Sequence, residues 1–236
     1  MRAEPALLLA LLGCGGVSAQ ANEPPPEASV TDCSATLAAG DDVEAHVAEG
    51  AVLCLQAGVH RVNLDLRVGL TLRGEPGAIL DGGRGGPVVR VGEHGKQIRL
   101  EQLEIRGGAY EMGSGVLVEG YSDVVIRDCA FVGNARGPGG GNGLAARRGT
   151  LQVERTRFGA ADEVLVTTVV EASFRDCAVE GTLRVEDGAQ VTVSGGTVGT
   201  VRLRGTSTRR PSVDLQGAAA GSVDNTAAWP GTVTGP

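Results

Sequence analysis

Apolar residues recur along this chain in an imperfect repeat that begins near Ile98 and continues toward the C-terminus. Between its apolar positions, segments such as 115–120 and 182–186 alternate apolar and polar residues, as half-buried strands do. The anchors of the repeat are Leu100, Ile126, Val153, Phe174, Val193 and Leu215, so successive steps are 26, 27, 21, 19 and 22 residues. A repeat of two helices usually needs more than about thirty residues. The steps therefore predict a solenoid of short parallel strands.

Charged residues next to the anchors alternate in sign from one repeat to the next. The first column contains Glu101, Arg127, Glu154 and Arg175, and the second contains Gln102, Asp128, Arg155 and Asp176. If the repeats stack as parallel strands, equivalent residues lie about 4.8 Å apart and opposite charges become neighbours. Exposed pairs of this kind contribute only about 0.2 to 1 kcal/mol each. We therefore interpret both columns as a device that fixes which coil stacks on which.

The composition agrees with a core built from strands. The chain has 236 residues, of which 42% are hydrophobic but only 3% aromatic, and 38 are glycine. Small inward side chains suit the narrow interior of one elongated solenoid domain. The formal charge of −7 provides no global basicity for a nucleic-acid partner, and no motif indicates a cofactor.

The N-terminus has the features of an export signal. Arg2 precedes an apolar run over 6–12 that is too short to span a bilayer. Residues 11–14, Leu-Leu-Gly-Cys, resemble the lipobox of bacterial lipoproteins. This resemblance implies a signal peptide over 1–14, a diacyl lipid on Cys14, and attachment to a membrane through that lipid.

A second cleavage site competes with the lipobox. Val17-Ser18-Ala19 has the small-x-small pattern of an ordinary signal peptidase site, which predicts a signal peptide over 1–19 and a periplasmic or secreted protein. We favour the lipoprotein. Gly15 after the lipidated cysteine resembles proteins sent to the outer membrane or cell surface, and the proline-containing segment 15–32 then becomes a tether.

Cysteine usage indicates an oxidising compartment. Cys33 and Cys54 flank the segment 41–49, which is predicted to be a short helix with Val43 and Val47 turned inward. Asp41 or Asp42 is the expected helix cap. A disulfide between the two cysteines would attach this helical cap to the first coil.

Cys129 and Cys177 belong to one inward column, with Thr156 between them. Two coil spacings separate them by about 9.6 Å, which is too far for a disulfide. We therefore expect two small, buried, free thiols.

Three segments near the N-terminus resemble the opening of the right-handed parallel β-helix proteins of the pectin-lyase-like group. They are 49–60, 70–74 and 79–83, with sequences EGAVLCLQAGVH, LTLRG and ILDGG. Phe131-Val132-Gly133-Asn134, followed by two glycines, is similar to repeats in polymorphic outer-membrane adhesins. The resemblance implies an all-β, right-handed, single-stranded parallel β-helix over 33–224, with a short helical cap before it and a tail over 225–236. This fold hosts lyases, hydrolases, adhesins and inert surface proteins, so it does not define an activity.

Enzymes of the group bind their polymer along the outer face of one long sheet. The middle residues of the strands expected there are Arg90, Leu117, Ala145, Leu165, Arg184 and Arg202. Related lyases place calcium-binding carboxylates beside a basic residue on this face, and related polygalacturonases place a cluster of aspartates. Neither pattern occurs here. The neighbouring outward column contains Gly92, Glu119, Arg147, Thr167, Glu186 and Arg204, which indicates more ion pairs rather than general acid–base pairs.

Other catalytic or metal-binding patterns are equally weak. His46, His60 and His94 lie far apart in the sequence and in the predicted coils, which argues against a zinc site or a histidine-dependent triad. The glycine-rich segment 137–143 lacks the Lys-Ser/Thr of a phosphate-binding loop. Asp162-Glu163 and Glu186-Asp187 are interpreted as structural charge in turns rather than as calcium sites. We therefore predict no catalytic residue and no metal ligand.

One surface patch suggests a ligand. Arg184, Arg202 and Arg204 are expected on adjacent coils of the exposed sheet, followed by Arg209-Arg210 in a loop. Such a cluster binds the carboxylates or sulfates of an acidic polysaccharide through bidentate hydrogen bonds. The competing interpretation is a solvated face that is partly neutralised by nearby acidic residues, namely Glu180, Glu186 and Asp187.

Together these observations predict a non-catalytic, exported β-helix that is a structural or binding module at a surface or in a periplasm, with an acidic glycan as the candidate ligand. The alternatives are a polysaccharide lyase or glycoside hydrolase of the pectin-lyase-like fold, and an adhesin-like module that binds a protein. A one-residue error in strand register exchanges inward and outward faces, and would hide an active site.

Overall fold

The structure, a computed structural model, describes residues 32–136, 142–226 and 229–235, and nearly every regular element in them is a short parallel strand. The signal peptide, Cys14 and almost all of the tether lie outside the described residues. The chain from Asp32 onward is one compact unit. No helix among the described residues is long and apolar enough to cross a membrane.

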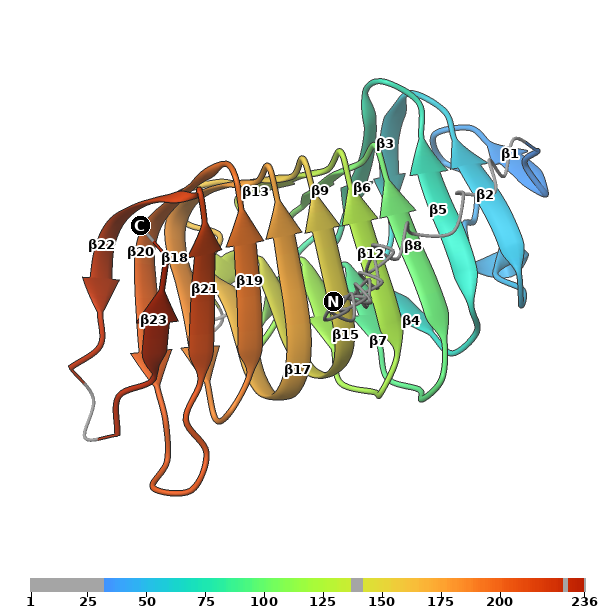
Figure 1. Cartoon of the computed structure of the whole chain (residues 1–236). Helices are drawn as coiled ribbons and strands as arrows, with labels where there is room; N and C mark the ends of the chain where they lie inside the picture. The colour runs from blue at the N-terminus through green and yellow to red at the C-terminus, as the bar shows by residue number, and fades with distance from the viewer. Residues whose placement is uncertain (1–31, 137–141, 227–228, 236) are drawn as a thin grey trace, which may run out of the picture. The chain divides into compact units, whose positions relative to one another are not determined.

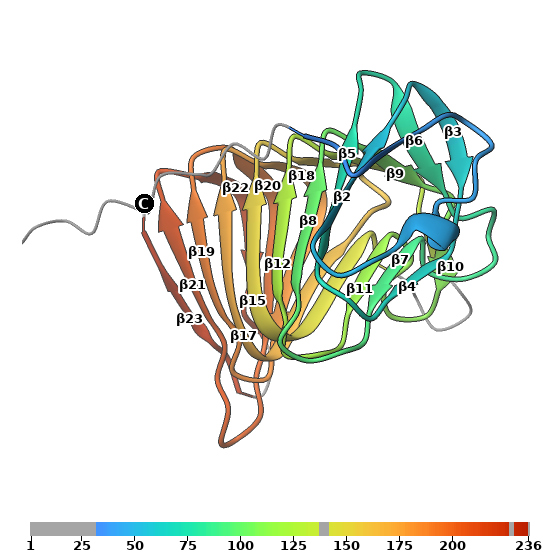
Figure 2. The ribbon, with the colours of Figure 1, turned by 90° about the vertical axis from the view of Figure 1, so that its right-hand side faces the viewer.

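Each complete coil contributes a strand to each of three faces, which we number along the chain starting from the face that contains β4 (Leu64–Leu66) (Figures 1 and 2). The first face contains β4 (Leu64–Leu66), β7 (Val89–Val91), β11 (Val116–Val118), the starts of β15 (Leu144–Glu154) and β17 (Val164–Arg175), and the ends of β18 (Ala178–Glu186), β20 (Thr197–Arg204) and β22 (Ala219–Asp224). The fold is therefore an all-β parallel β-helix, as the sequence predicts.

The second face is continuous from the N-terminal cap to the last strand. It contains β1 (Ala35–Leu37), β2 (Ala51–Leu55), β5 (Leu70–Gly74), β8 (Gln97–Glu101), β12 (Asp123–Arg127), the ends of β15 and β17, β19 (Gln190–Ser194), β21 (Ser212–Gln216) and β23 (Thr232–Thr234). Since β23 pairs with β21, strand pairing extends into the segment that the sequence assigns to the tail.

The third face is narrower. It contains β3 (Gly58–Arg61), β6 (Ala78–Asp81), β9 (Glu104–Arg106), β13 (Ala130–Val132), β16 (Arg157–Phe158) and the starts of β18, β20 and β22. Beside it lies a separate two-stranded pair, β10 (Ala109–Tyr110) with β14 (Ala135–Arg136).

The predicted register is confirmed at every anchor. The six anchors are successive partners on the second face, and each is at most 3% exposed: Leu100, Ile126, Val153, Phe174, Val193 and Leu215. Inward apolar residues from all three faces form one core along the solenoid. Within it Phe131 and Phe158 stack with ring centroids 4.5 Å apart, so aromatic packing joins consecutive coils.

The two charge columns also occupy the predicted positions. In the first, Arg127 lies between Glu101 and Glu154, and Arg175 follows. The second column forms the turn from the second to the third face, and its residues have positive φ angles of 57°, 52°, 45° and 52°: Gln102, Asp128, Arg155 and Asp176. Their backbone N–H groups donate to carbonyl oxygens of the next coil. The turn therefore continues the interstrand hydrogen bonding in a left-handed conformation that aspartate tolerates better than most residues.

The disulfide between Cys33 and Cys54 is confirmed, but the helical cap is shorter than predicted. Only one 3-10 turn forms, over Glu44–His46. Val43 is buried as expected, whereas Val47 is extended and only partly buried. The chain has to leave the helical conformation at that point, because β2 begins four residues later.

Alkylation tests both the disulfide between Cys33 and Cys54 and the assignment of Cys129 and Cys177 as buried free thiols. Burial raises the pKa of the Cys129 thiol to about 12 and that of Cys177 to about 11. Because the thiolate is the nucleophile, we expect no iodoacetamide labelling of the folded, unreduced protein near neutral pH. Unfolding without reduction should then label Cys129 and Cys177 only, as read by peptide mass spectrometry. Labelling of Cys33 or Cys54 without reductant contradicts the disulfide.

Candidate functional site

The outer surface of the first face has the predicted register but not the predicted exposure. Its column pairs in the expected order: Arg90, Leu117, Ala145, Leu165, Arg184 and Arg202. The three apolar members point outward and are nevertheless buried, with Met112 packed against them. A Cβ atom added to Gly113 would lie 2.9 Å from the Leu117 Cβ, so the segment before β11 lies directly on this surface. The middle of the face is closed rather than open to a polymer.

The predicted arginine cluster is assembled, but acidic side chains already pair with two of its members. Arg184 and Arg202 are direct strand partners. Arg184 lies 3.7 Å from a Glu163 oxygen and 3.2 Å from a Glu186 oxygen, while the Nε of Arg202 donates to Asp224 at 3.0 Å. These ion pairs reduce the positive potential that an acidic ligand would meet.

The partners differ in part from those expected. Glu186 is a partner, and it is also the strand neighbour of the exposed Arg204. Glu180 lies instead 3.9 Å from Arg157. Glu163 and Asp224 were not anticipated as partners. The sequence could have predicted Asp224 as a partner, because extending the column that ends at Arg202 by one more coil places Asp224 next to Arg202.

A further carboxylate of the first face, Glu119, is also paired with arginines. On the first face Glu119 lies 2.7 Å from Arg90 and 3.8 Å from Arg147. A general acid for glycoside cleavage needs a raised carboxyl pKa. The described carboxyl groups with a clear pKa shift, Asp81, Asp128 and Asp224, all have a lowered pKa.

The causes of these lowered pKa values are hydrogen bonds to the ionised form. The Gly83 backbone N–H lowers the pKa of Asp81, and the Arg155 guanidinium lowers the pKa of Asp128. The Thr226 hydroxyl and Arg202 lower the pKa of Asp224. Each of these groups is therefore held as a carboxylate, which is the wrong form for donating a proton.

The three histidines are separated, as the sequence indicates. Nδ1 of His46 lies 3.0 Å from the Asp42 carbonyl oxygen. Nε2 of the fully buried His60 lies 2.9 Å from the Gln56 carbonyl oxygen. Nδ1 of His94 accepts from the Tyr121 backbone N–H at 3.0 Å. Within the part of the chain that the structure describes, no group of three His, Cys, Asp or Glu residues is arranged to hold a metal ion.

A buried polar cluster at the edge between the third and first faces was not predicted. Asp162 is 1% exposed, and its carboxylate accepts from the backbone N–H groups of Gly133 and Asn134 and from the Asn134 amide. The Asn134 amide also donates to the Ile105 carbonyl and accepts from Gly108 N–H. This cluster joins three consecutive coils, so Asp162 is a structural charge, as the sequence indicates, although its burial and its partners were not predicted.

The second face contains a feature that the sequence did not reveal, a groove of about 460 Å³ over β15, β17, β19 and β21. The outward-facing residues of the groove form two rows that cross the four strands. The residues of the second row each follow a residue of the first row by two positions in the sequence. The first row is Thr150, Glu171, Gln190 and Ser212, and the second row is Gln152, Ser173, Thr192 and Asp214. Six of these eight side chains are uncharged hydroxyls or amides.

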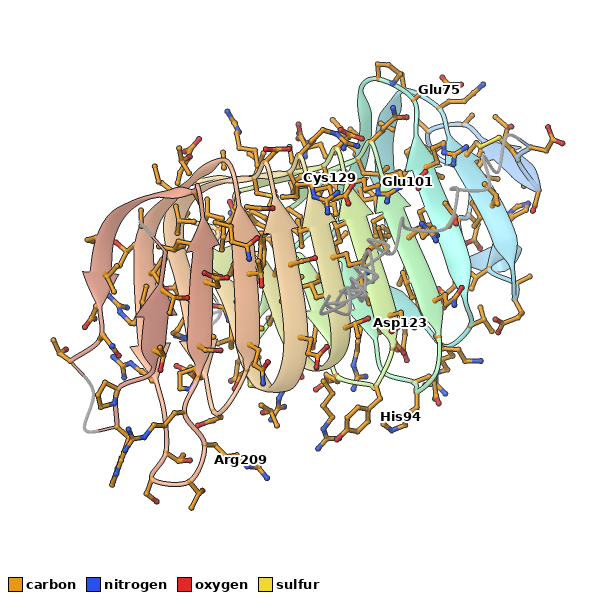
Figure 3. All side chains as sticks on the ribbon, in the orientation of Figure 1. Glu75, His94, Glu101, Asp123, Cys129 and Arg209 are labelled. Atoms are coloured by element: carbon orange, nitrogen blue, oxygen red, sulfur yellow. A yellow bond between two sulfur atoms is a disulfide. The ribbon has the colours of Figure 1, made fainter. Side chains whose placement is uncertain are left out.

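An exposed stack of planar side chains lies at the turn before β12. The rings of His94 and Tyr121 stack with centroids 5.4 Å apart, and the Arg148 guanidinium lies 5.5 Å from the Tyr121 ring centroid. Figure 3 shows His94 below Asp123, at the edge from which the second-face strands start. Asp123 accepts a 2.6 Å hydrogen bond from Thr150, the first residue of the groove.

No protein-family model matches this chain, and no curated protein matches it. The fold and its surface therefore define the structural class of this protein but not its family. The protein is a parallel β-helix whose outer faces carry ion-pair ladders, a closed apolar strip and a polar groove.

Proposed function

We propose that this protein is a non-catalytic β-helix that is exported and acts as a binding or structural module at a cell surface or in a periplasm. The observation that carries the proposal is the ion pairing of the first face. Arginines contact the carboxylates Glu119, Glu163 and Glu186, and apolar residues covered by Met112 fill the space between them. A retaining hydrolase needs two carboxyl groups about 5–5.5 Å apart, and a lyase needs a base beside a cation. On this face the carboxylates lie in ion pairs with arginines, which supports a structural role for them over acid–base catalysis.

Activity assays test this proposal directly. We expect no unsaturated product and no new reducing ends from pectate, alginate or chondroitin, with or without calcium. The neutral polysaccharides used in the binding experiment below serve as further substrates. Turnover that Arg184→Ala or Arg202→Ala abolishes would establish an enzyme and overturn the proposal. Binding of a protein but of no glycan would instead support the adhesin-like alternative.

Export through the lipoprotein route is part of the same proposal. Its support is the lipobox-like sequence at 11–14 together with the Cys33–Cys54 disulfide, which is typical of an oxidising compartment. We expect Cys14→Ser to move the protein from the membrane fraction to the soluble fraction. An intact wild-type N-terminus beginning at Gln20, found by mass spectrometry, would show that the alternative signal peptidase site is used.

An acidic glycan is the ligand that the arginine cluster suggests. Arg204, Arg209 and Arg210 are exposed beside the paired Arg184 and Arg202, and they support this candidate. Any such binding should weaken as salt concentration rises, and the double variant Arg184→Ala/Arg202→Ala should weaken it further. Binding that is insensitive to both would exclude this cluster as the site.

A further inference from the structure

We propose that the second-face groove binds an extended, neutral polysaccharide that lies along the solenoid axis. This inference rests on the proposed function as a binding module, and it names a site on a different face from the arginine cluster. The groove crosses β15, β17, β19 and β21, which Figure 1 shows side by side. Its length is set by stacked coils, so its walls repeat along the axis as a polymer's residues do.

The chemistry of the two rows suits sugar hydroxyls. Serine and threonine hydroxyls and glutamine amides both donate and accept hydrogen bonds, as each sugar hydroxyl also does. Direct partners in the rows include Gln152 with Ser173 and Ser173 with Thr192. Because the strand backbone is fixed in the ladder, these groups lie about 4.8 Å apart from coil to coil without further ordering.

The charges of the groove exclude an acidic polymer. Among the described residues that line it, the ionisable ones are Glu171 and Asp214, and none is a lysine or an arginine. Asp214 already accepts hydrogen bonds from Gln216 at 2.8 Å and from the Thr234 hydroxyl at 2.9 Å. A polyanion would meet only like charge here, whereas a neutral chain of hydroxyl groups meets donors and acceptors.

A peptide fits the groove less well than a glycan. Peptides recognised by β-proteins usually add a strand to a free sheet edge or place apolar side chains in pockets. The groove is a sheet face whose strands already pair on both sides. The apolar residues at its floor, Leu151, Ala172 and Val191, are buried core residues.

The test measures binding of the full-length protein to soluble neutral polysaccharides, namely β-glucan, xylan, glucomannan and dextran, by affinity electrophoresis and calorimetry. Pectate and alginate are the acidic comparison. Gln152→Ala/Thr192→Val removes two hydrogen-bonding side chains, one of them an amide and the other a hydroxyl, and should raise Kd at least about tenfold. Thr197→Ala is the matched control, because this exposed threonine belongs to the third face. It should leave Kd unchanged.

Salt dependence and the arginine variants separate the two surfaces. Binding in the groove should be nearly independent of salt and should survive Arg184→Ala/Arg202→Ala. Absence of binding to all four neutral polysaccharides, or binding that the groove double variant leaves intact, overturns this inference. If only acidic polymers bind, and the arginine variant abolishes that binding, the groove assignment fails while the proposed binding module stands. Hydrolysis or elimination of any polymer would instead overturn the proposed function.

Discussion

Arg127→Glu is expected to lower the free energy of unfolding by about 3 kcal/mol, nearer to the cost of breaking a buried ion pair than an exposed one. Arg127 and Glu154 are 17% and 15% exposed and lie 3.1 Å apart. The variant would place a third carboxylate between Glu101 and Glu154, which flank Arg127 in the register. Urea denaturation followed by circular dichroism measures the change.

A double-mutant cycle shows whether the effect comes from stacking. Adding Glu154→Arg to Arg127→Glu should recover about 1 kcal/mol, because the pair is restored with its signs exchanged. Recovery should be incomplete, since Arg155 and Arg175 lie 3.5 Å and 3.7 Å from the Glu154 carboxylate that is replaced. A coupling energy of zero would show that positions 127 and 154 do not interact.

Arg175→Glu is the matched control in the same column. It removes a partner of the same Glu154, but its side chain is 66% exposed. Solvent screening should therefore limit the loss to less than about 1 kcal/mol. An equal loss from Arg127→Glu and Arg175→Glu would mean that burial does not determine the strength of this ladder.

Asn134→Ala should lower the free energy of unfolding by about 4 kcal/mol. This value is near the upper end of the cost of leaving buried polar and charged groups without a hydrogen-bond partner. The amide makes three side-chain hydrogen bonds, to the Ile105 carbonyl, the Gly108 N–H and the Asp162 carboxylate. Alanine would leave all three partners buried with one bond fewer. Asn63→Ala is the control, because this exposed amide donates to the Pro87 carbonyl at the surface; a loss below about 1 kcal/mol is expected there.

Asn134→Asp separates the charge from the packing of the cluster. It would place a second carboxylate beside the buried Asp162 carboxylate, and this like charge together with burial raises the pKa of the introduced carboxyl group in the folded state. A raised folded pKa means that the variant is least destabilised at low pH, where one carboxyl is protonated and donates, and most destabilised above the raised pKa. Equal destabilisation of this variant, relative to wild type, at pH 4 and pH 7 would contradict the role of charge in the cluster.

The sequence alone determined the solenoid, its strand register and the ion-pair columns. The reason is that equivalent positions of successive coils lie next to one another. Inward positions therefore have to be apolar in every coil, and charged residues at equivalent outward positions have to avoid like charge in the adjacent coil. The positions of Ile126 and Arg127 therefore predict those of Val153 and Glu154 in the next coil. The disulfide was expected because Cys33 and Cys54 flank the segment predicted to form the cap.

The sequence repeat could not predict features that depend on the segments between strands, because these segments do not repeat from coil to coil. Only the tertiary structure determined them. Met112 covers Leu117 because the segment before β11 folds back over the first face, and no periodicity encodes that path. Asp162 is buried because Asn134, from the preceding coil, satisfies it. The groove is lined by residues of four stacked strands, so Ser173 and Thr192 become neighbours in it only when the coils are stacked.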